Sequence, residues 1–348
     1  MAGLEKYCGN LSNPKVTVLM SVYNGEKYLR EAIDSILDQS FKDFEFLIIN
    51  DGSIDKTHEI LKSYDGTCLR IIEQENMGLT KSLNKGLSLA KGQYIARMDA
   101  DDISLPHRLE KQVRLMDREP DIGICGTWVK TIGDSKEDIW RYPTEPEVIR
   151  CRMLFESALA HPSVMIRRSF FINNHLSYDE KLQWAQDYEL WVRCSSLSTL
   201  KNLEEVLLLY RSHPNGVGKR SSCEQRAAAN LVRKQQLSQI GLRPDSAEFN
   251  IHERLSYYDF EICKEFVEAA NLWLMKLLDA NGKVGYYHNS DFEQVLAKRW
   301  YRVCTMSSGL GLWVWKTFCQ SSLSKSAGLN FVQRAKLMAK CGMKYGAI

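Results

Sequence analysis

Apolar, β-branched runs alternate with amphipathic segments through the first hundred residues, and this alternation constrains the fold more than any other feature. The runs that have the length of strands are 16–22, 44–49, 69–73 and 94–98. Between them, apolar residues recur at helical spacing over 27–39, 58–64 and 79–90. Strands without a polar face are typical of parallel sheets that helices cover on both sides. The βαβαβαβ order therefore predicts an α/β fold with a mostly parallel, Rossmann-like sheet flanked by helices.

The pattern changes at a turn-rich segment, 213–218. Before it we expect further strands at 122–132, 164–167 and 206–210, and helices at 106–118, 146–155 and 187–195. After it the spacing is helical only, over 224–239, 254–278 and 290–303. A chain of 348 residues has room for about two domains. We therefore expect an N-terminal extension (1–13), an α/β domain (14–220) and a helical C-terminal region (221–348).

Polar side chains follow three of the expected strands. They are Ser21, Tyr23 and Asn24 at the end of the first strand, Asp51 after the second, and Asp99-Ala100-Asp101-Asp102 after the fourth. Parallel strands bring their carboxyl ends to one edge of the sheet, and ligands of open α/β sheets bind there. These residues are therefore the first candidates for a binding site.

The acidic cluster of Asp99, Asp101 and Asp102 is the most informative of these groups. Three carboxylates within four residues repel one another unless a cation lies among them. Hard oxygen ligands suit Mg²⁺ or Mn²⁺, which complete their coordination with water and substrate phosphates. The structural alternative is a solvated acidic turn that caps the helix starting near Pro106. The arrival of Asp51 at the same edge favours the metal site.

The usual phosphate-binding motifs are absent from the sequence. There is no GxxxxGK followed by Ser or Thr, and the turn after the first strand reads YNGEK in place of GxGxxG. A dinucleotide-dependent dehydrogenase would be expected to carry that glycine fingerprint. The turn therefore argues against NAD or FAD.

Three stretches of the sequence closely resemble family 2 glycosyltransferases of the GT-A fold. They are VTVLMSVYNGEKYLREAIDSILDQSFKDFEFLIINDGSIDKT, then ENMGLTKSLNKGLSLAKGQYIARMDADDISLPHRLEKQ, then AQDYELWVR. The resemblance covers about residues 14–215 and leaves the C-terminal third unassigned. It implies a nucleotide-binding half (about 14–105) and an acceptor half (about 106–220). The activity it implies is a metal-dependent, inverting sugar transfer in the synthesis of a bacterial surface polysaccharide such as O-antigen, capsule or exopolysaccharide.

The resemblance also implies how a nucleotide-sugar donor is held, with UDP-sugars favoured. Tyr23 would pack against the base, Asp51 would accept a hydrogen bond from the base imide, and Asp99 would hold the ribose or the sugar. The full set of donor-binding residues that it implies is Ser21, Tyr23, Asn24, Asp51, Lys81, Asn84, Arg97, Asp99 and Ala100.

The same resemblance assigns the metal site and the catalytic base. Asp101 would ligate Mn²⁺ or Mg²⁺, supported by Asp102, and His213 in YRSH would add a contact to the metal or the diphosphate. Asp187 would be the base that takes a proton from the acceptor hydroxyl. Many relatives carry Glu before this Asp, whereas this chain has Gln186.

Two alternatives to a catalytic Asp187 stay open. Its carboxylate could only favour the N-terminus of a helix, where acidic side chains are common. Glu189, two residues further on, could be the base instead.

Candidate acceptor-binding residues are Trp128, His161, Trp184 and Glu189. Tryptophan faces suit stacking on sugar rings. The His161-Pro162-Ser163 segment recurs in relatives that glycosylate polymers. For each Trp the alternative is core packing, and for His161 and His213 it is a structural hydrogen bond.

The C-terminal tail is basic and is interleaved with large apolar residues. No acidic residue follows Glu293, whereas nine Lys or Arg do. Such a composition is typical of interfacial helices on anionic membrane surfaces. The rivals are a tail that packs on the catalytic domain and a nucleic-acid arm, and no known motif supports the latter.

We expect a cytoplasmic location, and the basic tail allows peripheral attachment to the inner face of the cytoplasmic membrane. The longest small or apolar run near the C-terminus, 309–315, is too short to span a bilayer. The N-terminal residues MAGLEKYCGN have no apolar core, so we expect no signal peptide. Ten scattered cysteines without a CxxC motif are typical of reduced thiols in a cytosol.

Two other functions stay open at this point. A sugar nucleotidyltransferase also binds nucleotides through an acidic cluster, but it would typically carry a glycine-rich first loop. A catalytically silent carbohydrate-binding or scaffold subunit would keep the fold. The presence of Asp51, Asp99, Asp101 and Asp187 argues against the silent subunit, because a scaffold would tolerate their loss.

Overall fold

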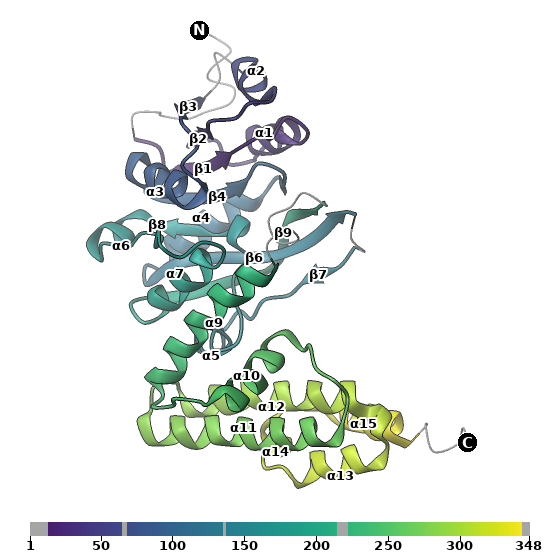
Figure 1. Cartoon of the computed structure of the whole chain (residues 1–348). Helices are drawn as coiled ribbons and strands as arrows, with labels where there is room; N and C mark the ends of the chain where they lie inside the picture. The colour runs from purple at the N-terminus through teal and green to yellow at the C-terminus, as the bar shows by residue number, and fades with distance from the viewer. Residues whose placement is uncertain (1–12, 65–67, 135–136, 214–221, 343–348) are drawn as a thin grey trace. The chain divides into compact units, whose positions relative to one another are not determined.

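The computed structural model describes residues 13–64, 68–134, 137–213 and 222–342 (Figure 1). The chain forms two compact units, one of Met1–Pro146 with Ser157–Ala228 and the other of Glu147–Glu156 with Ala229–Ile348. The described strands all belong to the first unit, and the second is helical. The helical unit thus begins after the limit expected at residue 221. It also takes in a short segment from within the α/β half of the sequence.

The first half of the sheet is parallel, as the sequence predicts. Its strands are ordered β3-β2-β1-β4, with β1 at Val16–Val22, β2 at Phe44–Asp51, β3 at Leu69–Gln74 and β4 at Tyr94–Asp99. The connecting helices are α1 (Leu29–Leu37), α2 (Thr57–Lys62) and α3 (Leu79–Leu89). Every residue of β2 is buried, which explains its uninterrupted apolar sequence. This half places the ends of β1, β2 and β4 at one edge.

The second half of the sheet mixes parallel and antiparallel pairs. β8 (Met165–Arg167) runs antiparallel to both β4 and β6 (Ile122–Gly133), and β9 (Thr199–Ser212) runs parallel to β6. Two further strands, β5 (Ile103–Ser104) and β7 (Ile139–Trp140), have only two residues each and escape detection by periodicity. The described sheet is therefore a mixed one of nine strands, with order β3-β2-β1-β4-β8-β6-β9-β5 and β7 paired to β6.

Helices and one short 3₁₀ turn complete the α/β unit. They are α4 (Arg108–Arg118), η1 (His161–Ser163), α6 (Arg168–Asn173), α7 (Gln186–Ser195) and the start of α9 (Ser222–Gln239). Buried strands β1, β2, β4, β6 and β8 and helices α1, α2 and α4 share one apolar core. A mixed sheet with flanking helices confirms the predicted α/β fold class.

The helical unit has its own apolar core. Its elements are α5 (Pro146–Arg152), the rest of α9, α10 (Ser246–Tyr257), α11 (Lys264–Val284), α12 (Asn289–Met306), η2 (Ser307–Leu310), α13 (Leu312–Gln320), α14 (Leu323–Ser326) and α15 (Phe331–Gly342). No helix in the described part of the chain is long and apolar enough to cross a membrane.

The single helix expected over 254–278 is wrong. The structure has α10 and α11 there, separated by Tyr258 in the left-handed region at φ +52°. The start of α10 carries a reciprocal cap, because Asp245 accepts from the Glu248 N–H and Glu248 accepts from the Asp245 N–H. The sequence Asp-Ser-Ala-Glu is a capping box that predicts a helix start at this point.

The expectation that all cysteines are reduced is wrong at one position. Cys68, beside the start of β3, is disulfide-bonded. Eight other cysteines in the described residues are free thiols.

Candidate active site

The carboxyl ends of β1 and β4 bring Ser21 next to Asp99. The two residues are Cα partners in the parallel pairing, and Ile49 of β2 flanks Ser21 on the other side. The acidic cluster continues from β4 into the loop before β5. The predicted edge site therefore exists as a set of neighbouring side chains.

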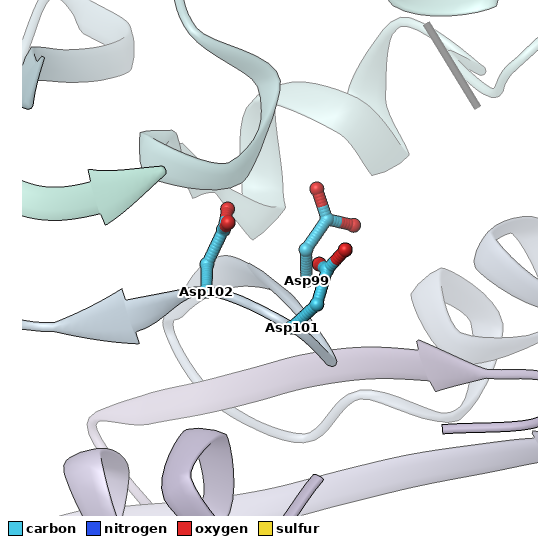
Figure 2. Close-up of side chains that lie close together, drawn as sticks. All are labelled: Asp99, Asp101 and Asp102. Atoms are coloured by element: carbon cyan, nitrogen blue, oxygen red, sulfur yellow. The ribbon is translucent and has the colours of Figure 1, made fainter. Parts of the chain in front are cut away.

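The side chains of Asp99, Asp101 and Asp102 lie close together at this edge (Figure 2). Each offers a carboxylate oxygen, and the three oxygens lie within 4.8 Å of one another. Asp102 is fully buried, and its Oδ1 accepts a hydrogen bond from the Arg211 N–H at 2.8 Å. Its Oδ2 is buried and has no hydrogen-bond partner among the described residues. A buried carboxylate oxygen without a donor, beside two other carboxylates, fits a hard divalent cation.

Charge repulsion at the cluster supports the same fit. Burial raises the pKa of Asp102 well above its usual range, and the charges of Asp99 and Asp101 add to this shift. Burial also raises the pKa of Asp99, although Arg97 opposes it. The Arg97 Nη2 lies 2.5 Å from Asp99 Oδ1. Two buried arginines, Arg97 and Arg108, interact electrostatically with a cluster of three carboxylates, so a further positive charge would stabilise the fully ionised cluster.

The end of β9 lies beside the cluster. His213 Nε2 lies 2.8 Å from Asp101 Oδ2, and its ring centroid is 5.4 Å from that of Tyr28. Arg211 donates through Nε to the Asp101 carbonyl at 2.7 Å and through Nη2 to Glu31 at 2.5 Å. The guanidinium of Arg211 also lies 4.5 Å from the Tyr28 ring centroid. The structure thus brings together His213 and Asp101, the two predicted metal ligands, and their role in metal binding stays a prediction. It also places Arg211 here, which the residues predicted from the sequence do not include.

Asp51 is buried at the end of β2 and organises a loop. Its Oδ1 accepts from the Met77 N–H and the Gln74 amide, at 2.9 and 2.6 Å, and its Oδ2 accepts from the Gly78 N–H at 2.9 Å. Burial acts to raise the pKa of Asp51, but these hydrogen bonds outweigh it and the pKa is lowered. Asp51 is therefore an ionised carboxylate that holds the loop after β3, which the sequence alone did not indicate.

Hydrogen bonds join the loops that follow β1 and β2. The Asn24 N–H donates to Ser53 Oγ and the Ile54 N–H donates to Asn24 Oδ1, both at 2.9 Å. The Gly25 N–H donates to Thr57 Oγ1 at 2.8 Å. Asn24 adopts φ +53°, a left-handed conformation that Asn tolerates better than most residues. Its amide oxygen therefore braces two loops of the predicted donor site.

Three large apolar side chains are exposed on these loops. Tyr23 is 51% exposed, Ile54 86% and Met77 51%. Such side chains can pack against the flat face of a heterocycle. The donor-binding residues predicted from the sequence include Tyr23 but neither Ile54 nor Met77. An apolar residue within a polar turn, as in Gly-Ser-Ile-Asp, is the signal that could have found them.

Asp187 lies in the first turn of α7. Burial raises its pKa, while hydrogen bonds from the backbone N–H groups of Tyr188 and Asp187 itself and the charge of Arg97 oppose the shift. Its charge in turn raises the pKa of Asp99, so the two carboxylates share one electrostatic environment. The neighbouring Gln186 is buried, and its amide oxygen has no partner among the described residues.

Glu189, the alternative base, is engaged elsewhere. Its two oxygens accept from Arg193 Nε and Nη2 at 2.6 and 2.8 Å. Arg193 also donates to the Ser177 carbonyl at 2.7 Å. The pair is spaced i,i+4 on α7, a spacing that predicts such an ion pair from the sequence. Glu189 therefore fits a structural ion pair better than a free base.

His161 belongs to an aromatic group beside Arg97. Its Nε2 lies 2.8 Å from the Tyr178 hydroxyl, and its ring packs edge-on against Trp191 at 5.9 Å. Burial lowers the pKa of His161 well below its usual value, and the charge of Arg97 adds to this shift. His161 is thus a neutral imidazole with a structural hydrogen bond.

The two predicted acceptor tryptophans differ in their surroundings. Trp128 on β6 donates its indole N–H to the Tyr142 carbonyl at 2.9 Å, and Arg141 lies over its ring at 5.5 Å. Trp184, just before α7, adopts φ +75°. A bulky aromatic residue in the left-handed region is uncommon, and such backbone strain is typical of functional positions.

Three other predicted donor residues lie away from the carboxylates or against the core. Lys81 is exposed on α3. The Asn84 amide bonds the Tyr178 carbonyl and N–H, at 3.0 and 2.9 Å, and so holds the loop before α7. Ala100 packs against the apolar core. Within the described residues neither Lys81 nor Asn84 forms a hydrogen bond or ion pair with the acidic cluster, and the donor roles of all three residues stay predictions.

The fold and this site define an α/β transferase of the GT-A type, and comparison with known proteins gives the family. The model of Glycosyl transferase family 2 matches residues 17–175. An uncharacterised glycosyltransferase of Methanocaldococcus jannaschii is 40% identical over 212 residues, which are 58% of this chain and 72% of that one. The O-antigen biosynthesis glycosyltransferase WbnJ of Escherichia coli is 32% identical over 228 residues, 63% and 88% of the two chains. This chain belongs to glycosyltransferase family 2 and is a glycosyltransferase.

Solved structures share the fold at low sequence identity. The structure of S. aureus TarS residues 1–349 in complex with UDP-GlcNAc has a TM-score of 0.57 and 18% identity, and it covers 95% of this chain and 91% of that one. At this identity the likeness concerns the fold alone. It confirms the GT-A-like architecture.

Proposed function

We propose that this glycosyltransferase moves a sugar from a nucleotide-sugar to a hydroxyl of a glycan or lipid-linked glycan, with inversion, in surface polysaccharide synthesis. The observation that carries the proposal is the gathering of Asp99, Asp101 and Asp102, where Arg97 pairs with Asp99 and the charge of Asp187 acts on Asp99. The O-antigen relative in E. coli supports the polysaccharide context. We place the reaction in the cytoplasm, at the inner face of the membrane.

The donor would bind at the edge formed by β1, β2 and β4. Tyr23, Ile54 and Met77 offer an apolar surface for the base, and the loop held by Asp51 presents Met77. Ser21 lies beside Asp99, where the ribose or sugar would bind. UDP is the first nucleotide to test, because TarS, which has the same fold, was solved with UDP-GlcNAc.

Asp101, Asp102, Asp99 and His213 would hold Mn²⁺ or Mg²⁺. When bound, the ion would offset the negative charge that develops on the departing diphosphate. His213 and Arg211 keep the Asp101–Asp102 loop in place through the hydrogen bonds described above. The preformed loop limits the reorganisation needed on binding.

Asp187 would act on the acceptor. As the acceptor oxygen forms its bond to the anomeric carbon, its proton passes to the Asp187 carboxylate and the bond to the diphosphate breaks. Attack from the face opposite the leaving group inverts the anomeric centre. The raised pKa of Asp187 makes it a stronger base than an exposed aspartate. Trp128 and Trp184 would offer faces for the acceptor sugars, and His161 would shape the site through Tyr178.

Thermal unfolding with UDP, GDP, dTDP, CDP and NAD, each with and without Mn²⁺, tests the donor site. A ligand at 100 times its dissociation constant stabilises the fold by about 2.7 kcal/mol. We expect one nucleoside diphosphate to stabilise the protein only with Mn²⁺, and Asp101→Ala to lose that stabilisation. Glu189→Gln is the matched carboxylate control and should keep it. Stabilisation by NAD, or none by any nucleotide, would contradict the proposal and favour the silent subunit.

A further inference from the structure

Helix α15 turns an apolar face away from the helical unit. Leu337 and Cys341, one turn apart, are fully buried and anchor the helix. On the opposite side Phe331 is 85% exposed, Val332 56% and Met338 51%. Ala335 and Ala339 are exposed on the same side, so the apolar stripe is continuous. Helix α15 packs against α12, α13 and η2, and the side chains of its outward stripe are exposed in the described part of the chain.

Cations flank this apolar stripe. Lys336 and Lys340 are exposed on one side of it, and Arg334 lies on the other, where it donates to the Ser324 carbonyl. Within the described residues neither lysine forms an ion pair. The lysines on α11 differ, since Lys276 pairs with Glu248 and Lys283 pairs with Asp279. The positive charge around α15 is therefore free to meet an external anion.

Two more apolar side chains are exposed in elements that precede α15. Leu312 on α13 and Met306 at the end of α12 are exposed, at 47% and 37%. Beyond Glu293 the chain has no acidic side chain. An outward apolar stripe with cations at its borders is the pattern of a helix that lies in the plane of a membrane surface.

We propose that the outward face of α15, made of Phe331, Val332, Ala335, Met338 and Ala339 with Lys336 and Lys340 at its border, docks on an anionic phospholipid bilayer. Charge decides between the possible occupants. A symmetric contact with a second copy would bring like charges together, which disfavours it. A nucleic acid would match the charges but leave the apolar stripe without a partner. The proposal goes beyond the proposed reaction and does not rest on it.

Vesicle flotation of the full chain tests the proposal without any donor or acceptor. We expect binding to vesicles of phosphatidylcholine mixed with phosphatidylglycerol, and none to phosphatidylcholine alone. Binding should weaken as salt rises, because counterions screen the lysines. Lys336→Glu with Lys340→Glu should weaken it at least about tenfold, since each basic residue near an anionic surface contributes roughly a further factor of five. Phe331→Ser with Met338→Ser should weaken it as well.

Control variants distinguish a specific role of the outward face of α15 from a general effect of lost apolar surface or reversed charge. Leu272→Ser removes a 70% exposed leucine from α11, and Lys62→Glu with Arg114→Glu reverses two exposed charges in the α/β unit. Both should bind vesicles as the parent does. The thermal midpoint of each variant reports folding, and the charge reversals at exposed positions keep the test valid if the serine variants unfold. Absence of vesicle binding, equal binding to neutral vesicles, or self-association that depends on Phe331 would overturn the proposal.

Discussion

The two units bury polar side chains in different ways. In the helical unit, three side chains from α9 and α10 reach consecutive carbonyls of the inserted segment. Gln236 donates to the Met153 carbonyl at 2.7 Å, His252 Nε2 to that of Leu154 at 3.1 Å, and Arg233 Nε to that of Phe155 at 2.7 Å. In the α/β unit, Nε and Nη1 of buried Arg97 and Oδ2 of Asp102 have no hydrogen-bond partner within the described residues, and these atoms adjoin the acidic cluster.

Buried polar atoms without partners among the described residues occur in the helical unit too, as at Arg299 Nε and Trp300 Nε1, so the units differ in what surrounds such atoms. Carbonyls beyond the end of a short helix need donors, and buried side chains supply them around α5. His252 also accepts from the Trp273 indole, and burial lowers its pKa to about 3, so it stays neutral. Around Arg97 and Asp102 the unmet hydrogen-bonding capacity lies next to the acidic cluster. There it is available to a substrate or an ion.

The largest expected effect is on transfer by Asp187→Asn. Removal of a general base reduces the rate by about 100- to 10,000-fold. We expect the turnover number to fall by that amount while the stabilisation by nucleotide and Mn²⁺ persists. Steady-state kinetics of the sugar transfer, with Glu189→Gln as control, measures it. Undiminished turnover in Asp187→Asn, or loss in Glu189→Gln alone, would move the base to Glu189.

The pH profile should follow the raised pKa of Asp187. The base must be ionised, so kcat/KM should fall as the pH drops, and the fall should begin at a higher pH than for an exposed aspartate. Stability should move in the opposite sense. The Asp187 carboxyl holds its proton more tightly in the native state than in the unfolded chain. The free energy of unfolding should therefore fall as the pH rises from the unfolded-state pKa of this group through its raised native pKa.

Chemical denaturation across this pH range shows whether the ionised Asp187 carboxylate stabilises or destabilises the fold. Asp187→Asn should raise the free energy of unfolding at neutral pH and change it little in acid, where the parent carboxyl is already neutral. A variant less stable than the parent at neutral pH would show that Asp187 is a stabilising group of α7.

A matched pair of arginines tests the comparison of the two units directly. Arg233→Met leaves the Phe155 carbonyl without a donor, which should lower the free energy of unfolding by about 1–3 kcal/mol. The folded fraction should keep its specific activity. Arg97→Met should instead abolish transfer by folded protein, because Asp99 loses its partner and Asp187 loses the charge that favours its ionised form. Chemical denaturation and specific activity, measured on both variants, distinguish the two roles. Equal losses of specific activity in the two variants would contradict a structural role for Arg233 and a functional role for Arg97.

The smallest effect concerns the cap of α10. Asp245→Ala removes a carboxylate that accepts from the Glu248 N–H at 2.9 Å. Loss of such a cap costs about 1 kcal/mol. We expect that decrease in urea unfolding with no change in KM for the donor. A change in KM would mean that this helix start affects the donor site.

Much of the site could be predicted because it depends on local pattern. The strand that ends at Asp99 and the one that ends at Asp51 are recognisable from their apolar runs, and parallel strands share an edge. The pairing of Glu189 with Arg193 was also readable from i,i+4 spacing. The two-residue strands β5 and β7 carry no readable period, and the break at Tyr258 has neither Gly nor Pro to mark it.

The sequence by itself determined the α/β class, the edge at which the carboxylates gather and the family of the chain. Only the tertiary structure decided which hydrogen bonds those carboxylates already make. It sets His213 against Asp101 and uses Asp51 to hold the loop at Met77, and no described residue donates to Oδ2 of Asp102. It also decided which side of α15 is buried. The physical reason is sequence separation. Periodicity is a property of residues close together in the chain, whereas the partner of a buried polar atom comes from a segment far away in the chain.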